Sequence, residues 1–474
     1  MPGLQHLSPA PSPLLTTAAR NRRAPLQRRT RYAFVGTGGR VKTFLDPVAG
    51  QFAAHAEIAG LCDLSLVRAR VHQQRLHTRF GCANVPVFRH TDFDRMLAET
   101  RPDTVVVCTI DREHDAYILA ALEAGCDVIT EKPMTISAEK CAAILQAAEK
   151  SGRSIRVAFN YRWGAGASKV REILAQGAIG VVRQVTLEYL LNTSHGADYF
   201  RRWHANNADS GGLLVHKSTH HFDLVNWWID AIPDEVFAYG ALAFYGRSNA
   251  FRRGDGALAA YPRYLGHEGK NDPFAYDYAR SMIQDASMER ALYLGAAEEE
   301  TGYVRDRNVF RDDITIEDAM TVLVRYRTGV LLNYSLNAFS PYEGFRVAFA
   351  GDRGRLEYEE RHGAHILGAP LDVNEHLHAG GATLRVLPHF QEPFTVAIPP
   401  LSGAHGGADA LLQEQLFSPN PPADPLRRTA GHEQGAASIL VGVAANRSME
   451  FGKAVRLASL VALRPDASHL SELT

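Results

Sequence analysis

The first part of the chain alternates short apolar runs with longer segments of helical periodicity. Runs rich in β-branched and aromatic residues predict strands over Tyr32–Val35, Glu57–Cys62, Thr104–Thr109, Asp127–Thr130 and Ser154–Phe159. Helical segments between them include Asp111–Ala124 and Ser137–Lys150. Because such alternation requires parallel strands joined by crossover helices, we expect an α/β domain with a doubly wound parallel sheet over residues 32–160.

Beyond residue 160 the pattern becomes the two-residue alternation of strands with one buried face. Strands are predicted over Val181–Leu191, Glu235–Phe244, Met320–Tyr326, Val330–Asn337 and Phe345–Phe349. We therefore expect residues 161–474 to form a second, α+β domain with an open, mostly antiparallel sheet. The polar stretch at about 246–311 predicts an insertion in that domain. Residues 400–435 predict a loop and residues 433–449 a helix.

Composition and charge narrow the class of protein. Residues 1–31 hold six arginines and no acidic residue, and they lack the apolar core of a signal peptide, so we expect a disordered basic tail. In the whole chain, 51 basic and 52 acidic residues give a net charge of -1. A chain this close to neutral has no overall positive potential that would attract nucleic acid or an anionic membrane. Five cysteines without CxxC spacing suit a reducing cytoplasm, where we expect the protein.

A glycine-rich turn follows the first predicted strand directly, and Asp63 ends the second strand. Glycines let the backbone approach a pyrophosphate, although Val41 stands where a third glycine is usual. A carboxylate at position 63 can accept both hydroxyls of an adenine ribose. The pattern predicts a Rossmann domain that binds NAD, while Arg68 and Arg70 leave NADP open. The turn reads Gly36-Thr37-Gly38-Gly39-Arg40.

Glu131-Lys132-Pro133 follows the fourth predicted strand, at the edge where open α/β sheets bind ligands. Lys132 could face a nicotinamide and a substrate hydroxyl, and a Glu–Lys pair on a surface loop fits the spacing equally well. Thr109, at the end of the third strand, and His114, in the next helix, complete the cofactor-binding candidates with Glu131 and Lys132.

These motifs and a later segment, Gly211-Gly212-Leu213-Leu214-Val215-His216-Lys217-Ser218-Thr219-His220-His221-Phe222-Asp223, resemble the Gfo/Idh/MocA oxidoreductases. The resemblance runs from about Tyr32 to about Leu457. It implies a Rossmann domain and an open-sheet domain with the active site between them. It also implies hydride exchange between NAD(P) and a carbon that bears a sugar or polyol hydroxyl, and assembly into dimers or tetramers.

By the same resemblance, Lys132 and His220 handle the hydroxyl proton together with an aspartate four residues before the histidine. This chain has His216 at the aspartate position and Ser218 at a usual glycine, which leaves the proton acceptor open. Histidine titrates near neutral pH, and a desolvated lysine can also act as a base. We therefore take Lys132, His216 and His220 as the catalytic candidates.

A zinc site is the alternative for these histidines. His216 and His220 share one face if the segment is a single helix, and Asp223 could add a ligand. No cysteine or clear third ligand lies nearby, so we expect no metal.

Aromatic, basic and imidazole side chains near the predicted cleft suit a carbohydrate, because rings pack on sugar faces and planar polar groups bind hydroxyls. Each could equally be a core or surface residue. Asp409, in the same loop as His405, could also reach the cleft, and Asn337 and Glu343 at strand ends are weaker candidates. The substrate-binding candidates are Arg162, His195, Tyr199, Trp203, Lys217 and His405.

The sequence thus predicts an NAD(P)-dependent dehydrogenase acting on a secondary hydroxyl or ketone of a sugar, cyclitol or glycoside. Two alternatives stay open. One is a glycosidase in which tightly held NAD transiently oxidises the sugar. The other is a non-catalytic sensor of sugar or nucleotide, against which the retention of Lys132 and His220 argues.

Overall fold

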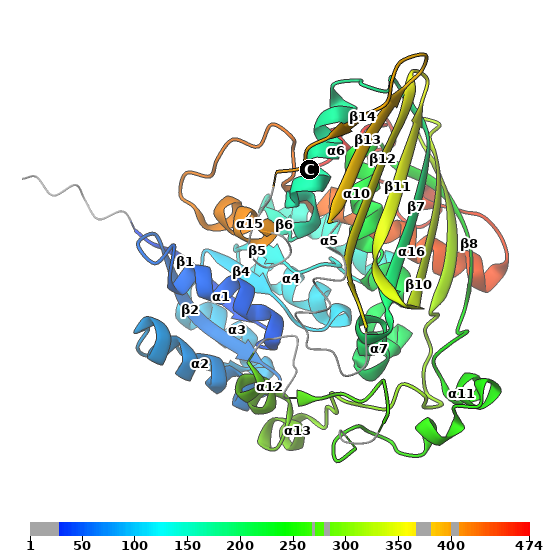
Figure 1. Cartoon of the computed structure of the whole chain (residues 1–474). Helices are drawn as coiled ribbons and strands as arrows, with labels where there is room; N and C mark the ends of the chain where they lie inside the picture. Colours follow the sequence, from blue (N-terminus) through cyan, green and yellow to red (C-terminus); the bar gives the residue numbers. More distant parts are fainter. Residues whose placement is uncertain (1–27, 268–270, 279–284, 366–380, 400–406) are drawn as a thin grey trace, which may run out of the picture.

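The computed structural model describes residues 28–267, 271–278, 285–365, 381–399 and 407–474. The chain forms two sheets, each flanked by helices, which lie side by side in Figure 1. The parallel sheet A is built mainly from the first third of the chain, and sheet B from the remainder. His405 and residues 1–27 of the predicted basic tail lie outside the described residues. Thr30 and Arg31, predicted to belong to that tail, begin strand β1, which corrects the predicted end of the tail.

Sheet A has the strand order β15-β6-β5-β4-β1-β2-β3, and all its pairings are parallel except that of β15 with β6. This is the doubly wound order, with its switch point between β1 and β4. The predicted strands are confirmed, and β3, only three residues long, was not anticipated. The bounds are β1 Thr30–Val35, β2 Ala56–Asp63, β3 Val87–Arg89, β4 Thr104–Val107, β5 Asp127–Thr130, β6 Ile155–Val157 and β15 Ala430–Gly431.

The helices of this domain begin and end at recognisable residues. Ser65 and Ser137 accept hydrogen bonds from the N–H groups of Arg68 and Lys140, which caps α2 and α5. Gly81 and Gly152 then end these helices in the left-handed region. The helices are α1 Lys42–Ala49, α2 Leu66–Phe80, α3 Phe93–Thr100, α4 His114–Glu123 and α5 Ala138–Ser151.

Sheet B has the order β14-β13-β12-β11-β7-β10-β9-β8-β16, and among its described pairings only β7 with β10 is parallel. In β9, buried residues alternate with residues facing away, as the sequence pattern predicted. Strands β12–β14 were not anticipated. The bounds are β7 Val182–Asn192, β8 Pro233–Ala241, β9 Ala319–Tyr326, β10 Leu331–Ser340, β11 Tyr342–Gly351, β12 Gly354–Ala364, β13 Ala382–Pro388, β14 Phe394–Val396 and β16 Val455–Arg456.

Helices α10 (Thr219–Ile229) and α16 (His432–Phe451) pack together, and α16 also packs on β8 of sheet B. A Cβ at Gly442 of α16 would lie 2.3 Å from the carbonyl oxygen of Leu214, so only glycine lets α16 approach the short helix α9 (Leu213–His216) this closely. Although α16 is long, no helix within the described residues is both long and apolar enough to cross a membrane.

The chain between β8 and β9, residues 242–318, is called here the β8–β9 connection. It contains α11 (Arg247–Arg253), α12 (Ala286–Tyr293) and α13 (Ala296–Thr301). Phe244 and Tyr245, near its start, contact β10 of sheet B, while α12 and α13 reach across to α2 of the first domain. Farther along, α15 (Ala408–Phe417) corrects the expectation that residues 400–435 form only a loop.

A buried ion pair lies where the chain passes from the first domain to the second. Arg162 binds both carboxylate oxygens of Asp223 in α10 at 2.7 Å and donates to Gln434 of α16 at 2.8 Å. The Arg162 side chain has 0% exposure. This corrects its assignment to the substrate, because the guanidinium is fully used in joining three elements.

Replacing Arg162 with Ala should leave the Asp223 carboxylate buried without a counter-charge. We expect the free energy of unfolding to fall by about 3–5 kcal/mol, measured by urea denaturation. Arg183→Ala is the control: its side chain is 65% exposed in its pair with Asp352, so its loss should cost about 1 kcal/mol or less. Equal small losses in the two variants would contradict a structural role for the buried pair.

Candidate active site

The glycine turn brings the end of β1 against the end of β4. Gly36 has φ +84°, and a Cβ there would lie 2.4 Å from the carbonyl carbon of Cys108. Glycine alone meets both constraints. The turn leads through a short 3₁₀ turn, Gly39–Val41, into α1. The first N–H groups of this helix therefore lie at the carboxyl edge of sheet A, an arrangement that fits a pyrophosphate.

Asp63, the last residue of β2, is buried beside this turn. Its carboxylate accepts hydrogen bonds from the N–H and hydroxyl of Thr37 and, at 2.8 Å, from the N–H of Ser65. The Arg68 guanidinium lies 4.0 Å away. The carboxylate is thus held at the strand end where a dinucleotide ribose binds in this fold.

An ion pair connects the glycine turn with the loop after β5. Arg40 Nε donates to Glu131 Oε1 at 2.6 Å, and the other carboxylate oxygen of Glu131 accepts from the N–H of Lys132 at 3.1 Å. Asp409, at the start of α15, lies 3.7 Å from Arg40. These contacts fix the backbone from which the Lys132 side chain extends.

His114 ties two loops together instead of contacting the cofactor, which corrects its assignment. Its Nδ1 lies 2.8 Å from the Pro133 carbonyl and its Nε2 lies 3.2 Å from the Thr109 carbonyl. Burial lowers the pKa of His114, and the side chain is only 1% exposed, too little for a ligand to reach it. Thr109 takes part through this carbonyl, and its hydroxyl donates to the Ile110 carbonyl.

The catalytic candidates Lys132 and His216 meet, and Asp111 joins them. Lys132 Nζ lies 3.4 Å from His216 Nε2 and donates to the His216 carbonyl at 3.2 Å. The other ring nitrogen, Nδ1, lies 2.5 Å from Asp111 Oδ2. Asp111 and Lys132 follow β4 and β5, whereas His216 ends α9, so this chain of contacts joins the two domains.

Burial and neighbouring charge set the protonation of these groups. Burial lowers the pKa of Lys132 to about 8, although Asp111 acts in the opposite direction. Burial, followed by the Lys132 ammonium, holds the pKa of His216 well below its usual range. Burial also raises the pKa of Asp111, against the effect of Lys132. A neutral imidazole with its proton on Nδ1 presents the Nε2 lone pair to Lys132, so the carboxyl group acts on the lysine through the ring.

His220 is held by stacking. Its ring lies parallel to that of Tyr161, with centroids 4.1 Å apart. Lys217 donates to the Tyr161 hydroxyl at 2.9 Å and lies 5.0 Å from the centroid of the Tyr189 ring. Burial raises the pKa of Tyr161, but Lys217, with smaller effects of His362 and Tyr189, makes the net shift downward. Lys217 is buried and its amine supports Tyr161, and its predicted contact with substrate stays a prediction.

The geometry separates the side chains of the zinc alternative. Helix α9 ends at His216 and α10 begins at Thr219, so His216 and His220 do not share one helix face. His216 contacts Asp111, and Asp223 is paired with Arg162. In the described part of the chain, no three His, Cys, Asp or Glu side chains are grouped to hold a metal ion.

Two of the substrate-side candidates lie against His216, and a third, His195, contacts one of them. The rings of Tyr199 and Trp203 approach the imidazole edge-on, with centroids 5.6 and 5.7 Å away. His195 Nε2 lies 3.1 Å from the Tyr199 hydroxyl, and its Nδ1 lies 2.9 Å from Glu343. Burial raises the pKa of Glu343, but His195, His362 and Lys217 together outweigh burial and hold that pKa well below its usual range. The result is an aromatic wall with a hydrogen-bonded Glu–His–Tyr chain beside the catalytic candidates.

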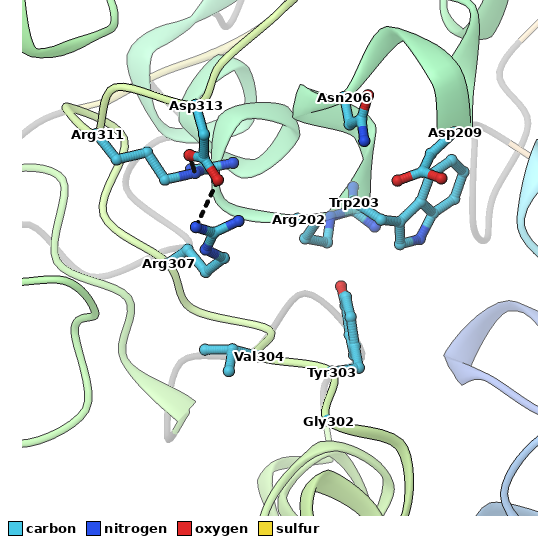
Figure 2. Close-up of a pocket in the computed structure, with 10 residues that line it drawn as sticks. All are labelled: Arg202, Trp203, Asn206, Asp209, Gly302, Tyr303, Val304, Arg307, Arg311 and Asp313. Atoms are coloured by element: carbon cyan, nitrogen blue, oxygen red, sulfur yellow. Dashed lines mark hydrogen bonds and ion pairs between the residues drawn. The ribbon is translucent and has the colours of Figure 1, made fainter.

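Trp203 also lines a cavity of about 470 Å³ between the helices after β7 and the end of the β8–β9 connection. This volume suits a small-molecule site. In Figure 2 the Tyr303 hydroxyl points toward Arg202 and Trp203 from the opposite side, and an ion pair joins Arg307 to Asp313. The lining residues are Arg202, Trp203, Asn206, Asp209, Gly302, Tyr303, Val304, Arg307, Arg311 and Asp313.

Sequence reasoning missed Asp111 and Tyr161 as parts of this site. Asp111 comes directly after the β4 segment, at the carboxyl edge already assigned to Lys132, so the same edge rule could have found it. Tyr161 gave no such signal, because its role depends on stacking against His220 and bonding to Lys217.

Comparisons with known proteins agree with this geometry. The oxidoreductase family model for the NAD-binding Rossmann fold (GFO_IDH_MocA) matches residues 30–159, and the model for the family's C-terminal alpha/beta domain matches residues 171–457. The Bacillus subtilis protein YteT, named as an oxidoreductase, is 37% identical over 438 residues, covering 90% of this chain and 97% of YteT. The D-glucoside 3-dehydrogenase of Escherichia coli is 32% identical over 134 residues, 28% of this chain and 36% of that enzyme.

A solved structure shows the same fold. The WlbA dehydrogenase from Bordetella pertussis, in complex with NADH and UDP-GlcNAcA, superimposes with a TM-score of 0.58 at 16% identity, covering 91% of this chain and 99% of that chain. The chain belongs to the Gfo/Idh/MocA oxidoreductase family. It is an enzyme of the dehydrogenase class that uses a nicotinamide cofactor, and the glycine turn and Asp63 fit such a cofactor.

Asp111→Asn tests whether this carboxyl group positions His216 and acts on Lys132. We expect kcat to fall roughly 100-fold, as for other histidines that lose their orienting carboxylate. Asp111 raises the pKa of Lys132, so removing its negative charge should lower that pKa. The pH at which turnover rises should then move below about 8. The measurement is the pH profile of nicotinamide reduction.

Asp115→Asn is the matched control, because Asp115 lies one turn into the same segment and pairs with Lys140 away from Lys132. This variant should leave unchanged both kcat and the pH at which turnover rises. If Asp111→Asn lowers kcat but turnover still rises at the same pH as in the unmodified enzyme, Asp111 has a structural role only.

Proposed function

We propose that the protein oxidises a secondary hydroxyl of a sugar, cyclitol or glycoside with NAD, or reduces the corresponding ketone. The observation that carries this proposal is that Lys132 and His216 meet beside the rings of Tyr199 and Trp203. These groups lie at the carboxyl edge of the nucleotide-binding sheet. Proton-transfer groups and sugar-packing rings are therefore next to the position of a nicotinamide.

In this proposal Lys132 exchanges the hydroxyl proton. Oxidation of an alcohol needs a base for that proton, and the bound nicotinamide supplies the hydride acceptor. Lys132 as a neutral amine accepts the proton, and as an ammonium it returns the proton to a ketone. His216 and Asp111 orient the amine, and His220, fixed by Tyr161, shares the substrate hydroxyl with it.

A hydroxyl-rich ring is supported as substrate by the groups beyond the catalytic pair. Tyr199 and Trp203 offer ring faces and edges, and the Glu343–His195–Tyr199 chain offers donors and acceptors for vicinal hydroxyls. The D-glucoside 3-dehydrogenase relative acts, by its name, on a glycoside. The adjoining cavity leaves room for a second residue of a glycoside.

NAD is the favoured cofactor in this proposal. The buried Asp63 carboxylate at the end of β2 would repel a 2′-phosphate. Arg68, the cation that could offset that repulsion, already donates to the Leu292 carbonyl at 3.0 Å and lies between the rings of Tyr293 and Tyr303.

We also infer a homo-oligomer that forms through the open face of sheet B. Tyr239, Leu323 and Leu331 are 69%, 51% and 52% exposed on strands β8, β9 and β10. Such a row of apolar side chains is typical of an interface. The five free cysteines support the expected reducing compartment, the cytoplasm.

The direct test of the proposed function is absorbance at the reduced-nicotinamide band after mixing the protein with NAD or NADP and a panel of sugars, cyclitols and glycosides. Growth of the band with one member supports the proposal and identifies the substrate class. Glycoside cleavage without growth of the band would replace it with a redox glycosidase. Ligand binding with neither reaction would replace it with a sensor.

The oxidation rate should rise with pH through about 8. Below the pKa of Lys132 the amine carries its proton and cannot accept another, so oxidation is slow and ketone reduction is favoured. Above it the neutral amine accepts the hydroxyl proton. Lys132→Ala should abolish turnover while NADH binding, followed by fluorescence, survives. A flat pH profile, or loss of NADH binding in this variant, would contradict the assigned role.

Asp63→Ala should weaken NAD binding about tenfold, because the ribose hydroxyls lose a charged acceptor. NADP binding should change much less or improve, since the repulsion of the 2′-phosphate is removed. Dissociation constants from calorimetry decide this. Equal weakening of both cofactors would overturn the ribose assignment.

A further inference from the structure

One segment of the β8–β9 connection, Leu292–Tyr303, lies on the nucleotide-binding half of the first domain. Figure 1 shows α12 and α13, which contain most of it, against α2 and away from the strands of sheet B. The segment therefore reaches the edge where the glycine turn and Asp63 meet.

Tyr293 lies directly on the glycine turn. Its hydroxyl accepts a hydrogen bond of 2.8 Å from the N–H of Gly39, the first residue of the helical turn that leads into α1. A Cβ added at Gly38 would come within 3.2 Å of this hydroxyl. A tyrosine hydroxyl that accepts one hydrogen bond still has its own proton to donate. This proton is available at the helix N-terminus where a pyrophosphate binds.

Arg68 extends the contact toward the ribose position. Its guanidinium lies 5.4 Å from the Tyr293 ring centroid and 5.6 Å from that of Tyr303, and its Nε donates to the Leu292 carbonyl. The same guanidinium is 4.0 Å from Asp63. The segment thus contacts the glycine turn, where a pyrophosphate would bind, and reaches Asp63, which is placed to bind the ribose, through Arg68.

Glu300 ties the far end of the segment to α2. Its carboxylate accepts from the Ser65 hydroxyl at 2.7 Å and from the Val67 N–H at 3.2 Å, and it pairs with Arg89 at 2.9 Å. Ser65 is the N-cap of α2 and also donates to Asp63. The segment is therefore anchored on both sides of the adenosine half of the cleft.

We infer that Leu292–Tyr303 is a wall of the cofactor site. Tyr293, anchored by Gly39, donates its hydroxyl proton to a pyrophosphate oxygen of the dinucleotide. Glu300 holds the segment closed over the adenosine half. Release of the cofactor then requires these contacts to open, so the enzyme retains its dinucleotide between turnovers. This inference concerns the cofactor alone and does not depend on the identity of the sugar.

The test is NADH binding to the full-length protein without any sugar, so failure of the substrate proposal leaves it intact. Tyr293→Phe removes only the hydroxyl. We expect its NADH dissociation constant to rise about tenfold, as for loss of one hydrogen bond to a charged group, with most of the change in the dissociation rate. Glu300→Gln should raise the NADH dissociation rate several-fold in stopped-flow fluorescence.

Glu299→Gln is the control, because Glu299 is the exposed neighbour of Glu300 in α13. It should leave NADH binding and release unchanged. Thermal unfolding of all three variants confirms that each is folded. Unchanged or tighter NADH binding by Tyr293→Phe would overturn the inference, since a hydroxyl that merely competes for Gly39 would give tighter binding. Equal release rates for Glu300→Gln and Glu299→Gln would overturn the anchoring role.

Discussion

The contact of Lys132 with His216, backed by Asp111, is the interaction on which the proposed active site depends. A lysine side chain placed between two domains loses water, and this desolvation lowers its pKa toward the range useful for proton exchange. Here a neutral imidazole stands between carboxyl and amine, so Asp111 orients the lysine through the ring.

Much of the surrounding fold serves this geometry. The ring of His114 joins the loops after β4 and β5, from which Asp111 and Lys132 arise. On the other side, Gly442 lets α16 press against α9, the helix that ends at His216. Small shifts in either support would separate the Lys132 amine from the imidazole, which explains why tightly packed, buried elements surround a polar site.

The sequence predicted the parallel sheet and the open, mostly antiparallel sheet, because the alternation of strands and helices and the glycine turn are local features. The site roles of Lys132, His216, His195, Tyr199 and Lys217 stay predictions. The sequence misplaced Arg162, whose partner Asp223 lies 61 residues away. The contact of Tyr293 with Gly39 spans 254 residues, and no local pattern indicates it. The basic tail and His405 stay predictions.

In the proposed active site, Asp111 supplies, through His216, the carboxyl group that the family pattern places at position 216. The most direct measurement compares kcat for Asp111→Asn with kcat for the double variant Asp111→Asn/His216→Asp. We expect an aspartate at position 216 to restore most of the activity lost in the single variant, because a carboxylate again acts on Lys132. A double variant no more active than Asp111→Asn would contradict it.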